Sequence, residues 1–265
     1  MAKKKSLKNK PAGVAIEPTG FVNFNKAAYR WHGGELAAVH LPESISKQSL
    51  LGLDEQQALL NRNLKRFISG KPALNVLLWG EKGAGKSTLV RLWAKQYAAV
   101  GLRIVEFRDT DYYSIYELYR IFRANDELSF ILYFDDVSFD NSDENYRDFK
   151  SIVEGGLESK PQNVIFVATS NRRHLVSEKA ADTDDLYNRD SQNESTSLFA
   201  RFGLAVGFYP INKELYLDIV KYYFDAEQLP IYDGWQQDAE NFAIDHGGRS
   251  GRTAQQFVIY KQIHN

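Results

Sequence analysis

The clearest chemical signal in the sequence is a glycine-rich segment that carries one lysine and one serine. Gly80, Gly85, Lys86 and Ser87 match the pattern GxxxxGK[ST], and they lie between the apolar run NVLLWG and the helix-like run STLVRLWAKQYAAVG. In such a strand–loop–helix unit, backbone N–H groups of the loop and the positive end of the helix surround a phosphate. The segment therefore predicts ATP binding. The residues that we assign to the nucleotide are Gly80, Glu81, Lys82, Gly83, Ala84, Gly85, Lys86, Ser87 and Thr88.

A second segment, FILYFDD, predicts a magnesium site together with this loop. We expect Lys86 to reach the β- and γ-phosphate oxygens and the Ser87 hydroxyl to ligate Mg²⁺. Asp135 ends an apolar run, as in a Walker B strand, and is the natural partner of the ion, directly or through a water. Asp136 is the candidate general base for the attacking water. For both aspartates, a capping or turn carboxylate after a buried strand is the alternative interpretation.

A third segment, NVIFVATSN, ends in the polar residues Ser170 and Asn171. If its strand lies beside the strand that ends at the aspartates, Asn171 can hold the lytic water near the γ-phosphate. A strand-end asparagine is also common in turns. The run continues with Arg172, Arg173 and His174, for which contact with a neighbouring subunit or a ligand and a solvated cluster are both open.

Strand-like and helix-like runs alternate around these motifs. RIVEFR, FILYFDD, NVIFVATSN and LAVGFY are apolar strand candidates, and SIYELYRIFRAND and NYRDFKSIVEGGLE are helix-like runs between them. Such alternation predicts an α/β fold with a parallel sheet covered by helices on both faces. An amphipathic helix is predicted before the glycine-rich loop, ending at Gly70, and a polar exposed loop between Glu178 and Ser197.

Three regions follow from these patterns. Residues 1–45 show no sustained period and predict a basic, partly disordered tail followed by a loosely docked arm. Residues 46–209 form the predicted α/β nucleotide-binding core. Residues 210–265 carry three helix-like runs without strands, which predict a small C-terminal helical lid.

Composition limits the classes of partner. The 33 lysines and arginines nearly balance the 34 aspartates and glutamates, so the whole chain has no strong field for nucleic acid or an anionic membrane. Five lysines crowd the first ten residues, either as a solvated tail or as an arm that touches nucleic acid or acidic lipid. No apolar run is long enough to span a membrane, and no cysteine is present. We therefore expect a soluble, cytoplasmic protein.

The ordered set LGLDEQ, WGEKGAGKST, YFDDVSF, ATSNRRH, RFG and GGRSGRTAQQF resembles the AAA+ superfamily. More narrowly, it resembles a bacterial group of ATP-binding AAA+ proteins without an assigned function, in which a doubled aspartate, SNRRH and GGRSGRTA signatures occur together. The resemblance covers roughly Leu50 to Tyr260. It implies a five-stranded parallel core, a helical lid and assembly into a homo-oligomeric ring such as a hexamer.

The resemblance also implies roles for single residues. Arg201, in SLFARFG, resembles an arginine finger that acts on the nucleotide of a neighbouring subunit, with a structural salt bridge as the alternative. Arg252, at the start of a helix expected to be capped by Ser250, matches a sensor 2 arginine, and Arg249 is the alternative. Leu53 falls near the adenine. Most AAA+ enzymes have glutamate where this chain has Asp136, which leaves the general base open.

These observations favour an ATPase that binds and hydrolyses Mg-ATP at a subunit interface and drives a conformational change on an unknown protein or DNA client. The alternative is an ATP-dependent binding switch or loader with little hydrolysis, whose basic N-terminus contacts DNA. A small-molecule phosphotransferase is disfavoured because the sequence shows no acceptor-binding motif.

Overall fold

The computed structural model of the chain describes residues 16–17, 20–43, 50–108, 112–138, 144–155, 158–171 and 201–264. The basic N-terminal tail, the cluster Arg172–His174 and the predicted loop 178–197 lie outside these residues. The strands are β1 (Ala28–His32), β2 (Glu35–Ala38), β3 (Val76–Gly80), β4 (Leu102–Phe107), β5 (Ser129–Phe134), β6 (Val164–Ser170) and β7 (Leu204–Phe208). The helices are α1 (Asp54–Ile68), α2 (Lys86–Tyr97), α3 (Ile115–Arg123), α4 (Glu144–Glu154), α6 (Lys213–Ala226), α7 (Trp235–Asp245) and α8 (Gly251–His264), with short 3₁₀ turns η2 (Ala98–Val100) and η3 (Tyr112–Ser114).

The strands form one sheet in the order β2-β1-β4-β5-β6-β3-β7. All neighbouring pairs are parallel except β1 and β2, which are antiparallel. The predicted α/β fold with a parallel sheet is confirmed. The implied count of five strands is wrong, because the described residues place seven strands in the sheet.

The two additional strands come from residues 28–38, which the sequence places in the loosely docked arm. They are held by their side chains, since Tyr29 and Trp31 alternate onto one face and are almost fully buried. The indole Nε1 of Trp31 donates to the hydroxyl of Ser114 at 2.9 Å. The two strands have only five and four residues and lie in a segment rich in Lys, Pro and Gly. They are too short to show a strand period, which is why the sequence predicts a loosely docked arm there.

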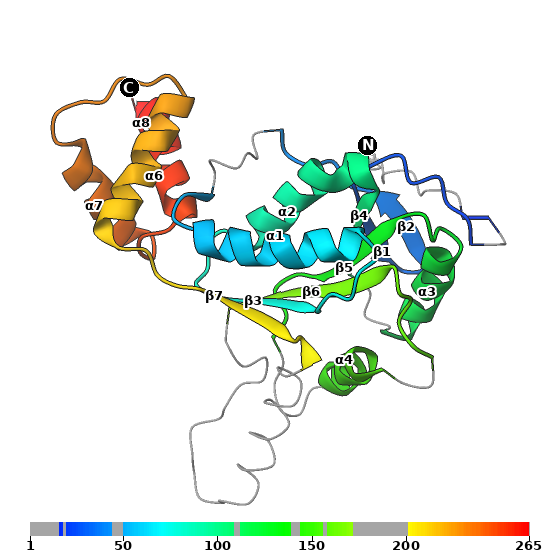
Figure 1. Ribbon diagram of the computed structural model, residues 1–265. Coiled ribbons are helices and arrows are strands. Elements are labelled where there is room, and N and C mark those ends of the chain that lie inside the picture. The colour runs from blue at the N-terminus through cyan, green and yellow to red at the C-terminus, as the bar shows by residue number, and fades with distance from the viewer. Residues whose placement is uncertain are drawn as a thin grey trace, which may run out of the picture.

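Two layers of helices enclose the sheet (Figure 1). Helices α1 and α2 pack on one face in a core that includes Leu60, Leu64, Leu89 and Trp93. Helices α3 and α4 contribute to the core on the other face. The alternation of strands and helices along the chain therefore produces the three layers that the sequence predicts.

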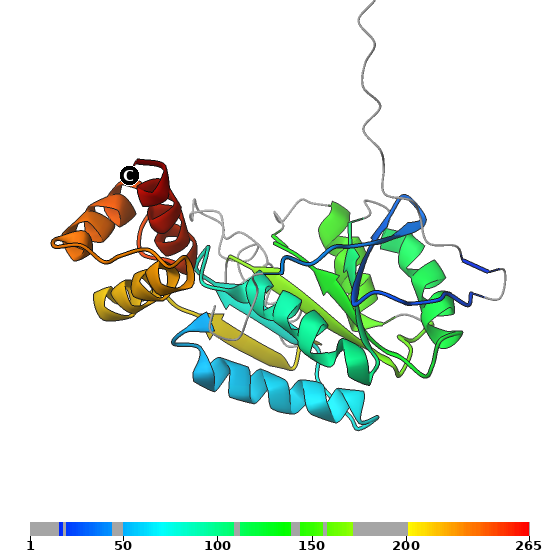
Figure 2. The ribbon, with the colours of Figure 1, turned by 90° about the horizontal axis from the view of Figure 1, so that it is seen from above.

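Helices α6, α7 and α8, here called the C-terminal helical group, stand together at one end of the sheet, opposite the β1–β2 hairpin (Figures 1 and 2). They share a core of their own, with Tyr216, Phe224, Trp235 and Phe257 among its buried members. Leu51, which precedes α1, packs against this core and so links it to the sheet layer. None of the described helices has the length and apolar character needed to cross a membrane.

The burial of Trp31 makes the β1–β2 hairpin part of the folded core. Replacing Trp31 by alanine removes a fully buried indole and its hydrogen bond to Ser114, and we expect a loss of about 3–5 kcal/mol in the free energy of unfolding. Chemical denaturation followed by circular dichroism measures it. Val100→Ala, at a site that is 60% exposed, is the control and should change stability little. Equal stability of both variants would contradict the placement of the hairpin.

Candidate functional site

The glycine-rich loop between β3 and α2 has a backbone that only glycine adopts without strain. Gly80, Gly83 and Gly85 have φ angles of 122°, 76° and 98°. A Cβ added at Gly80 would lie 2.0 Å from the carbonyl oxygen of Phe208, the last residue of β7. The N–H of Glu81 donates to that same oxygen at 2.9 Å. The loop is therefore fixed against the neighbouring strand.

Helix α2 begins at Lys86 without a side-chain cap, and its N-cap is Gly85 in the left-handed conformation. The N–H groups of a first helical turn have no acceptor within the helix, and the helix dipole adds positive partial charge there. With glycines on the loop before it, this helix start can accept an anion close to the backbone. The arrangement fits a phosphate group.

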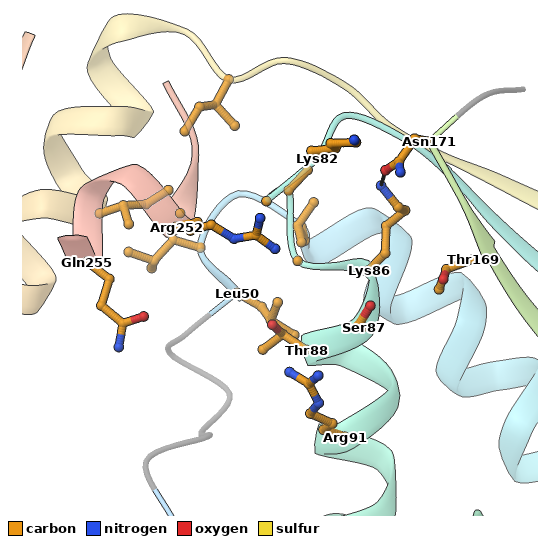
Figure 3. A pocket seen from close by; sticks show the side chains of 18 of the residues that line it. Leu50, Lys82, Lys86, Ser87, Thr88, Arg91, Thr169, Asn171, Arg252 and Gln255 are labelled. Atoms are coloured by element: carbon orange, nitrogen blue, oxygen red, sulfur yellow. Dashed lines mark hydrogen bonds between the residues drawn. The ribbon is translucent and has the colours of Figure 1, made fainter. Parts of the chain in front are cut away.

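Lys86 lies inside this loop, with 7% of its surface exposed. Its ammonium donates to the carbonyl oxygens of Gly80 and Glu81 at 2.6 and 2.8 Å and to Oδ1 of Asn171 at 3.3 Å. Figure 3 shows the contact between Lys86 and Asn171. Burial lowers the pKa of Lys86, although the nearby carboxylates, Asp136 first among them, oppose this shift.

Asp135 follows β5 and receives three hydroxyl groups on one oxygen. Its Oδ1 accepts hydrogen bonds from Ser87 at 2.9 Å, from Tyr133 at 2.6 Å and from Thr169 at 2.7 Å. Burial alone would raise the pKa of Asp135, but these hydrogen bonds outweigh it and hold the pKa below its usual value. The predicted neighbours Ser87 and Asp135 thus lie in contact, and the carboxylate is kept in its ionised form.

Three residues around Asp135 were not identified from the sequence. Tyr133 lies two residues before Asp135 and so faces the same side of the sheet, a signal that strand periodicity offers. Thr169 lies two residues before Asn171 on the adjacent strand β6. A terminal nitrogen of Arg108, after β4, is 3.8 Å from Oδ2 of Asp135, and its Nε is 2.8 Å from Glu106.

Burial and Asp135 raise the pKa of Tyr133 well above its ordinary range, so the phenol is a neutral donor.

Asp136 occupies an unusual backbone conformation beside Asn171. Its φ of 56° lies in the left-handed region, which costs energy for a residue other than glycine. Its N–H donates to the Thr169 hydroxyl at 2.8 Å, and its Oδ1 accepts from the Asn171 amide at 2.5 Å. Asn171 therefore contacts both Lys86 and Asp136, and the structure brings these three predicted residues together.

A pocket of about 480 Å³ opens between the glycine-rich loop and the C-terminal helical group. The predicted residues that line it are Leu53, Lys82, Gly83, Ala84, Gly85, Lys86, Ser87, Thr88, Asp135, Asp136, Asn171 and Arg252. Residues that were not predicted also line it, namely Leu50, Leu51, Arg91, Thr169, Tyr209, Ile211, Ile219, Tyr223, Gly251 and Gln255. One end of the pocket is polar and cationic, and the other is mostly apolar.

The two arginines before and in α8 have different surroundings. Arg252 extends from α8 into the pocket (Figure 3). Arg249 instead forms two hydrogen bonds with the Glu240 carboxylate of α7, at 2.9 and 2.5 Å. The Ser250 hydroxyl accepts from the Thr253 N–H at 3.1 Å, while the Ser250 N–H donates to the Thr253 hydroxyl at 2.9 Å. This reciprocal cap fixes the start of α8 and directs Arg252, rather than Arg249, to the pocket.

Arg201 is exposed just before β7 and is not among the residues that line the pocket of its own chain. The next residue, Phe202, is fully buried and stacks on Phe149 of α4 with 6.3 Å between ring centroids. The buried ring anchors the segment, and Arg201 is presented at the surface.

The oxygen donors at this site fit magnesium. Among the residues that the structure describes, no three His, Cys, Asp or Glu side chains gather to hold a metal. Mg²⁺ keeps several waters and binds through one or two carboxylates or hydroxyls together with substrate phosphates. The Ser87 hydroxyl and the Asp135 carboxylate, 2.9 Å apart at the helix start, are a donor pair of that kind.

The chain matches one family model in sequence and resembles solved structures in fold. A family model described as "Protein of unknown function (DUF815)" matches residues 24–263. No curated protein matches the sequence. Among solved structures, the Thermotoga maritima RuvB Holliday junction branch migration motor is similar, with a TM-score of 0.54 and 17% identity over 82% of this chain and 63% of that one. Two mutants of that motor give TM-scores of 0.54 and 0.53, with 16% and 15% identity, over 82% and 80% of this chain and 63% and 62% of theirs.

This chain therefore spans less than two thirds of the length of the RuvB structures that it resembles. At such low identity the likeness concerns the fold alone. It supports the α/β fold with a mostly parallel sheet that the alternating strands and helices predict.

The different surroundings of the two arginines predict different effects on stability. Arg249→Ala leaves the buried Glu240 carboxylate without its guanidinium, so we expect the melting temperature to fall by a few degrees. Arg252→Ala, at an exposed position, should leave it nearly unchanged.

This difference should also depend on pH. Hydrogen bonding to Arg249 lowers the pKa of Glu240 below its ordinary value of 4.5, so the ionised carboxylate stabilises the fold above that pH. The contribution is lost as the pH falls through the lowered pKa. The gap between wild type and Arg249→Ala should therefore narrow below about pH 4.5 in thermal unfolding measurements. A gap that widened in acid would contradict the ion pair.

Proposed function

We propose a function for this chain, which belongs to the DUF815 family. The protein binds Mg-ATP and hydrolyses it as an AAA+ ATPase. The observation that carries the proposal is the contact between the Ser87 hydroxyl and the Asp135 carboxylate, 2.9 Å apart at an uncapped helix start. Lys86 is the first residue of that helix, and its ammonium donates to the loop carbonyl of Gly80. Three features thus lie together in the fold: a loop suited to phosphate, a lysine that can neutralise its charge, and a pair of oxygen donors for magnesium.

The roles of these side chains follow from their positions. Lys86 now donates to loop carbonyls and Asn171, and a bound phosphate offers its ammonium stronger, charged acceptors. Ser87 and Asp135 would hold the magnesium ion, which would supply positive charge to offset the charge of the phosphates. The N–H groups at the start of α2 orient the phosphates.

The apolar end of the pocket suits the base of the nucleotide. Leu50, Leu51 and Leu53 contribute from the segment before α1, and Ile211, Ile219 and Tyr223 from the segment around α6. A purine ring between these two groups would contact both the sheet layer and the helical group. Arg252 would then face the phosphates from α8, so that the helical group acts as a lid over the nucleotide.

Asp136 and Asn171 are the candidates for activating water. The carboxylate of Asp136 is exposed at the pocket and accepts a proton in the general-base role, while the Asn171 amide orients it. Aspartate is one methylene shorter than the glutamate usual at this position. A shorter reach places the attacking water differently or slows turnover.

Arg201 acts across a subunit boundary in this proposal. Its exposure, and its place outside the pocket of its own chain, suit a finger that enters the pocket of a neighbour. Activity then requires a homo-oligomer, for which we propose a ring such as a hexamer. The likeness in fold to a branch migration motor makes DNA one candidate client, and a protein is the other. We propose a cytoplasmic location for the assembly.

The hydrogen bond from Asn171 to Asp136 favours a second candidate function. In this arrangement the general base is occupied by an amide donor and is held in a strained backbone. Such a site suits a switch or loader that binds ATP to change its assembly and hydrolyses it slowly. The two functions differ in the turnover of the assembled protein.

Phosphate release from ATP, measured over a range of protein concentrations, tests the proposal. Specific activity should rise with concentration as subunits assemble. Lys86→Ala should lower turnover by about 10² or more because it removes the phosphate-facing charge. Arg201→Ala should lower it by about 10³ or more while ATP binding is kept. Arg62→Ala is the matched control, because Arg62 is also an exposed arginine but lies in α1, and it should behave as wild type.

Binding of ATP without turnover at any concentration would refute the motor and leave the switch. Full activity of Arg201→Ala would show that the site is complete within one chain, which contradicts the shared site.

A further inference from the structure

The Asp135 carboxylate is held by more donors than the phosphate-binding loop supplies. Besides Ser87, its Oδ1 accepts from Tyr133 in β5 and Thr169 in β6, at 2.6 and 2.7 Å. The Tyr133 contact is the shortest of the three. These two donors belong to strands of the sheet, whereas Ser87 belongs to helix α2.

The packing around Tyr133 holds its hydroxyl in one place. Only 6% of its surface is exposed, and its ring lies in the core between the sheet and helices α1 and α2. A buried tyrosine has two side-chain torsions, both fixed here by packing. Asp135 directly follows β5 and lies two residues after Tyr133, so both side chains face the same side and the hydroxyl contacts the carboxylate.

The other two hydroxyls have further duties. Thr169 also accepts from the N–H of Asp136 at 2.8 Å. Ser87 donates to Asp135 and would turn its lone pairs to the metal ion, so its position depends on what is bound. Tyr133 holds the acceptor oxygen from within the core. Ser87 could then go on donating its hydroxyl hydrogen to Asp135 while its oxygen serves as a ligand of the ion.

The second oxygen of Asp135 faces the side chain of Arg108. Oδ2 is 3.8 Å from the Arg108 guanidinium, which is half-exposed and held by Glu106. A rotation of the carboxylate by less than a half-turn about its Cβ–Cγ bond would move Oδ1 away from the three hydroxyls. The hydrogen bond from the buried Tyr133 hydroxyl to Oδ1 opposes that movement.

We propose that Tyr133 is a positioning residue for the magnesium site, acting through a hydrogen bond that orients Asp135 toward the Ser87 hydroxyl and the ion. The inference rests on the proposed function, since it presupposes Mg-ATP at this pocket. Outer partners of metal ligands commonly change metal affinity by 10- to 100-fold when removed. With Thr169 and Ser87 still in place, the lower end of that range is expected.

Tyr133→Phe tests this because it removes the hydroxyl and keeps the ring. The measurement is the Mg²⁺ concentration for half-maximal binding of N-methylanthraniloyl-ATP to the full chain, followed by fluorescence. We expect about a tenfold increase in that concentration. Binding in excess EDTA should be unchanged, which a general loss of structure would not allow. Tyr216→Phe is the matched control, because it removes a buried hydroxyl that donates to Ala239 in the C-terminal helical group.

A double-mutant cycle with Asp135→Asn shows whether Tyr133 acts through the carboxylate. In the Asp135→Asn background, Tyr133→Phe should have little further effect on the Mg²⁺ requirement. An undiminished effect there, or an unchanged requirement in Tyr133→Phe alone, would overturn the inference and leave the proposed function standing. Loss of the native circular dichroism spectrum in Tyr133→Phe would also overturn the inference, because the hydroxyl would then be needed for folding rather than for positioning Asp135. If the wild type shows no Mg²⁺-dependent binding, the proposed function fails, and this inference with it.

Discussion

One carboxylate oxygen, Oδ1 of Asp135, connects the parts of the site. Ser87 reaches it from the start of α2, Thr169 from the end of β6 and Tyr133 from within β5. The three segments meet because β5, β6 and β3 are parallel neighbours, so that their carboxyl ends lie at one edge of the sheet. A shift of one residue in the register of β5 would turn Asp135 to the opposite face. The position of the carboxylate thus depends on the packing of the whole sheet.

The glycine-rich loop connects that edge to the C-terminal helical group. Gly80 lies against the Phe208 carbonyl, and a Cβ on Gly83 would lie 2.9 Å from the Ser250 hydroxyl that caps α8. In the proposed function, a change in the loop backbone on binding phosphate would therefore reach the start of α8 directly. Since α6, α7 and α8 have a core separate from the sheet, they can respond as a unit. This is the mechanical basis for coupling nucleotide state to motion in the proposed function.

Much of the fold could be predicted because strands buried on both faces leave long apolar runs, and the loop has a pattern that few other structures need. The β1–β2 hairpin could not, since Trp31 and Tyr29 owe their burial to contacts with distant segments such as Ser114. The sequence left Arg249 and Arg252 as alternatives, because the choice depends on how α7 packs beside α8 and presents Glu240. In the sequence Tyr133 resembles one more apolar residue of a buried strand, although its spacing to Asp135 puts both on one face.

The magnesium-nucleotide site is tested by calorimetric titration of the full chain with ATP, in the presence and absence of Mg²⁺, for the wild type and for Ser87→Ala. One nucleotide should bind per chain, with an affinity that Mg²⁺ strengthens in the wild type and strengthens much less in Ser87→Ala. Absence of binding at millimolar ATP, or an equal Mg²⁺ effect in both proteins, would contradict the claim that Ser87 and Asp135 form a magnesium-nucleotide site.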